Sequence, residues 1–159
     1  LTPSLPSLYE WSLPSFFSIT MAVRKIPTKT ANKPGEPPFK LELDPRDLLS
    51  LRWEKALGST FSDIKMTNQL DDMQCFKIKC TDNNIFRVRP PTGFIDPKTS
   101  ITIRVIQHAQ DKPPSNKHFI CIQHMKCTAA DSKKLFRMVW RADAKPDGII
   151  RIPIQFVDA

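Results

Sequence analysis

Glycine is scarce in this chain, with four glycines against fifteen prolines in 159 residues. Phosphate-binding loops need glycines at fixed spacing, because the backbone must come close to the phosphate. Neither a P-loop nor a dinucleotide-binding fingerprint is present, and the Gly-x-Ser-x-Gly sequence of many hydrolases is missing too. We therefore expect a protein that is not an enzyme and that needs no cofactor.

Long apolar runs are also missing. A membrane-spanning helix needs about 20 consecutive apolar residues, and no stretch approaches that length. Pro3, Pro6 and Pro14 interrupt the apolar start of the chain, and no lysine or arginine precedes them, so this start does not resemble a secretory signal. Because the first methionine is Met21, residues 1–20 are either translated upstream sequence or part of a longer extension. We expect a cytoplasmic protein without a membrane span.

The four cysteines form no recognisable disulfide framework or metal site. They are Cys75, Cys80, Cys121 and Cys127. A domain of this size needs no disulfides, so we expect four reduced thiols. Zinc-ligand residue types recur every three residues from His118 through Cys121 and His124 to Cys127, but residues three apart on a strand project to opposite faces. We expect no bound metal, and a strand with an inward cysteine and outward histidines.

Positive charge is what the chain has in excess. Lysine and arginine number 24 against 16 acidic residues, which gives a net charge of +8 at pH 7. This excess favours acidic partners, namely an acidic peptide, an anionic membrane surface or nucleic acid. The sequence contains no recognisable RNA- or DNA-binding motif, so we predict no nucleic-acid partner.

Residues 1–38 differ in composition from the rest of the chain. Between Met21 and Pro38 the sequence is basic and rich in proline, which is typical of a flexible or polyproline-like arm. The remaining length suits one domain with a sizeable core. We predict a flexible extension over residues 1–38 and a folded domain over residues 39–159.

Short runs of alternating apolar and charged residues recur throughout the predicted domain. Period-two alternation is typical of strands that are buried on one face, and turn residues separate the runs. The predicted strands cover residues 40–44, 49–53, 58–68, 76–79, 85–89, 100–107, 119–123 and 150–156. Pro153 predicts that the last strand lies at a sheet edge or carries a bulge. Residues 131–140 suit a short helix capped by Asp131. The series as a whole predicts an all-β sandwich.

The outward positions of the central strands are almost all cationic. Their residues are Lys77, Lys79, Arg87, Arg89 and Arg104, and no acidic residue punctuates them. Charged residues at such positions often only keep a sheet soluble and block edge pairing. They also suit an acidic partner. No acid, base or nucleophile cluster accompanies them, so the pattern predicts a binding surface rather than an active site.

Two adjacent sequences carry a family resemblance. Phe-Lys-Ile-Lys-Cys-Thr at residues 76–81 and Val-Arg-Pro-Pro-Thr-Gly-Phe-Ile-Asp-Pro at residues 88–97 resemble the central signature of the major sperm protein (MSP) domain. Nematode sperm cytoskeletal proteins and the VAMP-associated proteins (VAPs) of the endoplasmic reticulum share this domain. The similarity continues through residues 41–45, 64–68, 117–123 and 136–140 and the final isoleucine-rich strand. It implies a seven-stranded, immunoglobulin-like β-sandwich of the MSP/PapD-like type.

The resemblance implies two alternative functions. In the nematode branch, MSP dimers polymerise into filaments that drive sperm crawling, and small MSP-domain proteins modulate assembly; the partner would then be an MSP-type protein or a second copy, in the sperm pseudopod. In VAPs, the positions matching Lys77, Lys79 and Thr81 help to hold acidic FFAT-type peptides that contain aromatic residues. A further basic position of VAPs aligns with Phe119. That departure, and the absence of a coiled coil and a membrane anchor, lead us to expect the assembly role. The candidate binding residues are Lys77, Lys79, Thr81, Arg87, Arg89 and Arg104.

Overall fold

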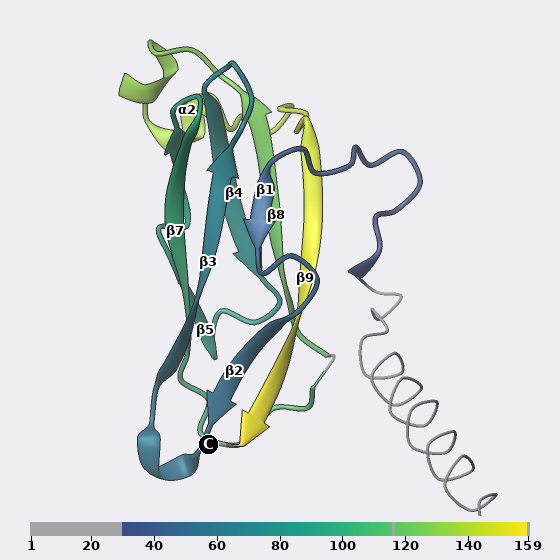
Figure 1. Cartoon of the computed structure of the whole chain (residues 1–159), viewed down its shortest axis with the longest axis vertical. Coiled ribbons are helices and arrows are strands. Elements are labelled where there is room, and N and C mark those ends of the chain that lie inside the picture. Colours follow the sequence, from purple (N-terminus) through teal and green to yellow (C-terminus); the bar gives the residue numbers. More distant parts are fainter. Residues whose placement is uncertain (1–29, 116, 159) are drawn as a thin grey trace, which may run out of the picture.

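Two β-sheets lie face to face in the computed structural model, which describes residues 30–115 and 117–158 (Figure 1). The four-stranded sheet has the order β1-β3-β7-β5, with bounds Glu42–Asp44, Thr60–Asn68, Thr99–Gln107 and Phe86–Arg89. The five-stranded sheet has the order β2-β9-β8-β4-β6, with bounds Leu49–Trp53, Gly148–Asp158, Phe119–Lys126, Gln74–Cys80 and Thr92–Ile95. The predicted all-β sandwich is confirmed. The properties predicted for residues 1–29 lie outside the described residues.

Prolines occur at two of the points where the chain crosses from one sheet to the other. Pro45 follows β1, and Pro90 and Pro91 follow β5, and in each case the next strand belongs to the opposite sheet. Proline has no backbone N–H to donate, so a ladder ends readily at such a position. Counting β1 with β2, and β5 with β6, as single strands that change sheets gives the seven strands implied by the resemblance.

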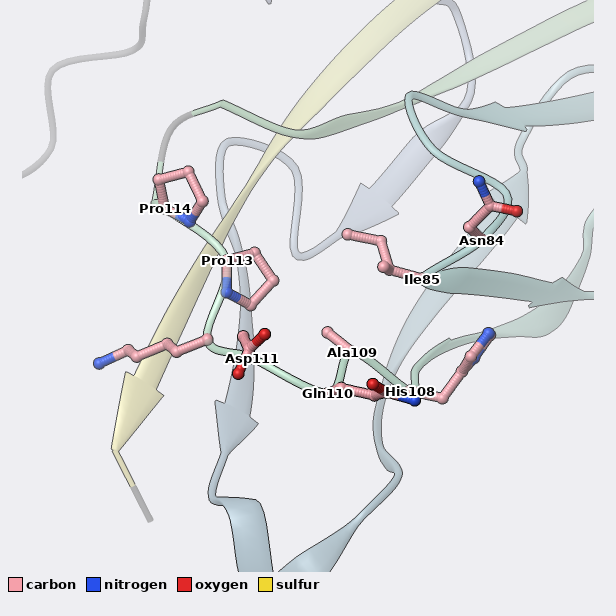
Figure 2. Close-up of a pocket in the computed structure, with 9 residues that line it drawn as sticks. Asn84, Ile85, His108, Ala109, Gln110, Asp111, Pro113 and Pro114 are labelled. Carbon is pink, nitrogen blue, oxygen red and sulfur yellow. The ribbon is translucent and has the colours of Figure 1, made fainter.

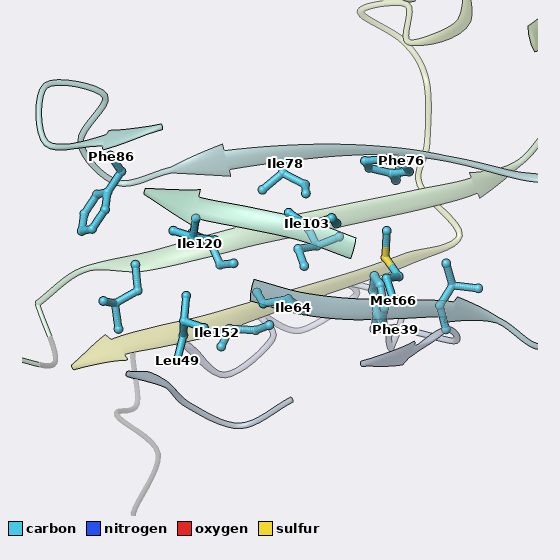
Figure 3. Packing of buried hydrophobic residues seen from close by; sticks show 14 of the residues in the cluster. Phe39, Leu49, Ile64, Met66, Phe76, Ile78, Phe86, Ile103, Ile120 and Ile152 are labelled. Atoms are coloured by element: carbon cyan, nitrogen blue, oxygen red, sulfur yellow. The ribbon is translucent and has the colours of Figure 1, made fainter. Parts of the chain in front are cut away.

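The hydrophobic core fills the space between the two sheets (Figure 3). Phe76 and Ile78 of β4 face Ile103 of β7, and Ile152 of β9 packs in the same cluster. These residues occupy the alternate positions that the sequence pattern assigns to the interior. Complete burial of one such side chain stabilises the fold by roughly 1.5–3 kcal/mol. The same alternation places the intervening charged residues on the outer faces.

Strand β9 lies between β2 and β8, so the predicted edge position is wrong, and the alternative of a bulge at Pro153 stays a prediction. Its first half pairs antiparallel with β8, from Gly148 to Pro153. Its second half pairs parallel with β2, from Ile154 to Asp158. Pro153, which has no N–H, therefore lies where the strand exchanges one partner for the other. This exchange explains how a proline fits within an interior strand.

Residues 32–38 lie along the side of β9 that β2 leaves open. The Ile149 N–H donates to the Pro37 carbonyl at 3.1 Å, and the Asn32 amide donates to the Ile149 carbonyl at 3.0 Å. The Arg151 guanidinium donates to both carboxylate oxygens of Glu36, at 2.7 and 2.9 Å. Figure 1 shows this segment in dark blue beside the upper part of β9. The domain boundary at Phe39 stays a prediction, and these contacts join part of the predicted arm to the sheet.

A short irregular segment after β8 covers one end of the five-stranded sheet. It contains two brief helices, η3 at Asp131–Lys133 and α2 at Phe136–Val139. The Asp131 carboxylate accepts hydrogen bonds from the backbone and hydroxyl of Thr128, whereas no side chain caps η3 at Ala130. The predicted cap is therefore wrong. Beneath the segment, Trp140 packs with the buried thiols of Cys75 and Cys127 in a second apolar cluster.

Candidate functional site

The predicted cationic residues divide between the two outer faces of the sandwich. Lys77 and Lys79 lie on β4 of the five-stranded sheet. Arg87 and Arg89 lie on β5, and Arg104 lies on β7, in the four-stranded sheet. Sequence alternation correctly turns all five outward. It contains no information on which strands share a sheet, so it could not separate them into two surfaces.

On the five-stranded sheet, two of the three candidate residues already have partners within the chain. The Lys77 ammonium lies 4.7 Å from the centroid of the Trp140 ring. Burial lowers the pKa of Lys77, and the charge of Lys79 lowers it further. The Thr81 hydroxyl lies 3.0 Å from His118 Nδ1 and accepts the Phe119 N–H at 3.3 Å. Lys79 is exposed, and no ion pair within the described residues engages it.

The histidines face inward, which is the opposite of the prediction. Ile120 and Ile122 of β8 are fully buried, so His124 shares their face and is fully buried as well, whereas Cys121 lies on the other face. His124 Nε2 accepts the Lys40 N–H at 3.1 Å, and its Nδ1 lies 2.9 Å from Gln74 Oε1. Burial lowers the pKa of His124 to about 4. Both ring nitrogens have protein partners, which identifies a structural histidine.

Neither a metal site nor a catalytic cluster is present in the described part of the chain. No group of three or more histidine, cysteine or acidic side chains is placed to hold a metal there. All four cysteines are free thiols. A hollow of about 550 Å³ lies between two loops and is lined by His108 and Asp111 among others (Figure 2). No hydrogen bond joins these two side chains in the described structure, so the hollow supports no catalytic assignment.

Arg104 forms an ion pair that the sequence pattern did not reveal. It donates to both Asp63 oxygens, from Nε at 2.9 Å and from Nη2 at 3.1 Å. Its guanidinium carbon lies 3.7 Å from the centroid of the Phe61 ring. The hydrogen bonds from Arg104 lower the pKa of Asp63. Asp63 faces Arg104 in the register of β3 and β7. Arg104 is therefore largely neutralised.

The two edges of the four-stranded sheet carry opposite charges. Edge strand β1 presents Glu42 and Asp44, and edge strand β5 presents Arg87 and Arg89. All four side chains are exposed, and none forms an ion pair within the described residues. Sequence analysis missed the two acids as site residues, although their alternation with leucines placed them outward. Only the strand order reveals that acid and base occupy opposite edges.

Comparison with known proteins identifies the family. A family model described as the MSP (major sperm protein) domain matches residues 40–145. The chain belongs to the MSP domain family. The chain is similar to an uncharacterized Caenorhabditis elegans protein, with 27% identity over 153 residues, covering 82% of this chain and 83% of that protein. Human vesicle-associated membrane protein-associated protein A is 32% identical over 91 residues, covering 56% of this chain and 35% of that protein.

Solved structures support the same fold for this MSP domain. The Caenorhabditis elegans MSP family member WR4 matches with a TM-score of 0.58 and 21% identity, covering 75% of this chain and 99% of that one. At this identity the likeness shows the fold alone. The predicted family is thus confirmed. The described helices of the MSP domain are all too short to cross a membrane.

Proposed function

We propose that this MSP-domain protein is a non-enzymatic component or accessory factor of a filament-forming cytoskeleton, of the kind that drives nematode sperm motility. It would act in the cytoplasm, through contacts with MSP-type proteins or with further copies of itself. Two observations give the general support: the family match, and the similarity to a Caenorhabditis elegans protein along most of both chains. The specific support comes from the edges of the four-stranded sheet.

The acidic edge of one molecule is complementary to the basic edge of another. Glu42 and Asp44 are two residues apart on β1, and Arg87 and Arg89 have the same spacing on β5. Each neighbouring pair in this sheet is antiparallel, so β1 and β5 run in opposite directions. A copy placed beside β1 with its β5 innermost would therefore continue an antiparallel sheet. Opposite charges that face each other across strands stabilise such pairing.

Edge pairing of this kind is open-ended. It joins two different surfaces of the same molecule, so each added copy leaves one acidic and one basic edge free. Such a contact extends into a filament unless its rotation closes a ring. It requires no nucleotide. The opposite charge of the two edges is the observation that carries the assembly proposal.

Charge reversal at either edge tests this assembly. Sedimentation velocity across a concentration series should detect self-association of the wild-type chain, weakening as salt screens the charges. The variant Glu42→Lys plus Asp44→Lys has two basic edges, and Arg87→Glu plus Arg89→Glu has two acidic edges. Each variant alone should associate at least roughly tenfold more weakly than wild type, because two attractive pairs become repulsive.

Mixing the two variants provides the decisive control. Each variant then offers the edge that the other lacks, so an equimolar mixture should recover association with alternating copies. Wild-type chain that stays monomeric at every concentration, with and without other MSP-type proteins, would overturn the proposal. Association that neither reversal weakens would show that the contact lies elsewhere.

A second candidate function is that of a VAP-like adaptor for acidic FFAT-type peptides. The observation in its favour is Lys79, which is exposed beside Lys77 on β4. The engagement of Thr81 with His118, and the apolar Phe119 beside it, disfavour this function. The variant Lys77→Glu plus Lys79→Glu should abolish peptide binding in an adaptor and leave edge-mediated assembly unchanged. Micromolar peptide binding by a strictly monomeric wild-type chain would favour the adaptor.

A further inference from the structure

The segment of residues 133–141, which we call the basic–apolar tip, exposes an unusual amount of apolar surface. Leu135 is 60% exposed, Met138 is 53% exposed and Phe136 is 47% exposed. They follow one another around α2, at the end of the sandwich where the segment projects beyond the strands (Figure 1). Three large apolar side chains in water at one protruding site indicate an interaction surface.

Packing of the core does not account for these residues. The inner side of the tip already has partners, because Trp140 is buried against Cys75 and Cys127, and Val139 packs on the same cluster. Phe136 lines a small hollow beneath the tip together with Val139 and Trp140. Leu135 and Met138 are three residues apart and lie outside that cluster. The short helix is therefore apolar on both its inner and its outer side. Only the inner side has a partner within the described part of the chain.

Cations flank the exposed apolar residues in the sequence. Lys133, Arg137 and Arg141 are all exposed, and no ion pair within the described residues engages them. Lys134 differs, because it pairs with Asp131 at 2.8 Å. The tip thus alternates unpaired basic side chains with unburied apolar ones. This combination is typical of protein surfaces that lie in the headgroup region of an anionic membrane.

We propose that the basic–apolar tip binds the surface of an anionic lipid membrane, a role separate from edge-mediated assembly. Leu135, Phe136 and Met138 enter the boundary between headgroups and acyl chains, while the neighbouring cations contact lipid phosphates and carboxylates. The tip is a convex projection, and a convex apolar surface suits a deformable lipid layer better than it suits a peptide, which needs a groove. Binding would place the tip on the membrane and leave both edges of the four-stranded sheet free.

The opposite end of the sandwich offers a matched control surface. Leu57, the last residue of the short helix η2 at Lys55–Leu57, is 50% exposed, and Phe61 is 54% exposed. Here the Arg104 guanidinium lies over the Phe61 ring and is neutralised by Asp63. The apolar exposure is therefore similar at the two ends. The control end has fewer free cations, because Arg104 is paired and the exposed Lys55 follows the exposed, acidic Glu54.

Vesicle co-sedimentation of the full chain tests the proposal. The probes are phosphatidylcholine vesicles with and without phosphatidylserine, in low salt. Wild type should bind the phosphatidylserine vesicles and not the neutral ones. The variant Leu135→Ser plus Met138→Ser should bind these vesicles at least about tenfold more weakly than wild type, because it removes two inserting side chains. The variant Lys133→Glu plus Arg137→Glu should lose more, since each cation contributes roughly fivefold near an anionic surface.

The control variant Leu57→Ser plus Phe61→Ser should bind vesicles as wild type does. All these side chains are exposed, so thermal unfolding should confirm that each variant is folded. Residues 1–29 also carry cations, so the comparison between tip and control variants decides the matter. Equal binding by tip and control variants, equal binding to neutral vesicles, or binding to an acidic peptide without binding to vesicles would overturn the proposal. The tip variants should self-associate as wild type does in sedimentation velocity. Loss of vesicle binding would then be independent of edge-mediated assembly.

Discussion

The two outer faces of the sandwich differ in how much of the chain covers them. The five-stranded sheet has residues 32–38 along one side of β9 and the segment around Trp140 over its end. On the outer face of the four-stranded sheet, Arg104 and Asp63 form a solvent-exposed ion pair, and both charged edges are open. The same period-two pattern thus produces a covered face and a bare face. We infer that side chains on the covered face mainly stabilise the fold, whereas those on the bare face remain free for partners.

Thiol reactivity should give the largest difference between the faces. Burial, together with the neighbouring Cys127, raises the pKa of Cys75 to about 12 from 9.0. The reactive thiolate should then be roughly a thousandfold scarcer than for an ordinary thiol. A cysteine introduced on the bare face by Thr102→Cys should react with iodoacetamide at the rate of a free thiol. Mass spectrometry of the native protein after timed alkylation measures both rates, and fast labelling of Cys75 would show that its cover opens readily.

The next largest difference should be in the free energy of unfolding that is lost when one aromatic side chain on each face is truncated. Trp140→Ala on the covered face should lower the free energy of unfolding by about 3 kcal/mol, because it leaves a cavity beside Cys75 and Cys127. Phe61→Ala on the bare face should lower it by less than about 1 kcal/mol, since Phe61 is mostly exposed. Urea unfolding measures both. Equal losses would contradict the distinction between the faces.

Removal of a single charge should give the smallest effect. Hydrogen bonds from Arg151, with a second contribution from the Lys33 N–H, lower the pKa of Glu36 from 4.5 to about 2. The folded chain therefore holds the ionised carboxylate more strongly than the unfolded chain does. This stabilisation is present above about pH 4.5 and is lost as the pH falls towards 2.

Glu36→Gln should therefore cost about 1–2 kcal/mol at pH 7, and its stability should converge with that of wild type in acid. Asp63→Asn, which breaks the ion pair on the bare face, should cause no measurable change, because solvent screens that pair. Chemical unfolding at a series of pH values provides the comparison. A flexible arm, as the sequence predicts, would make Glu36→Gln silent.

Local pattern was sufficient to predict the class of fold and the outward direction of the candidate cations. It failed where the outcome depended on strands distant in the sequence. Asp63 neutralises Arg104 from another strand, 41 residues earlier in the sequence. The histidine orientation was predicted wrongly for a different reason, since the buried Ile120 and Ile122 already determine which side of β8 faces the core. The contacts of Glu36 with Arg151 join residues 115 apart, which no composition of the arm can reveal.

The exchange of partners within β9 also has a consequence for how the chain reaches its fold. Ser50 and Gln155 meet across β2 and β9 although they are 105 residues apart in sequence. Closing so large a loop carries a high entropic cost and slows folding. During synthesis, β2 and β8 both lack their shared neighbour until β9 leaves the ribosome, so their edges stay open to other chains. The nascent protein should therefore be most prone to aggregate just before its last strand emerges.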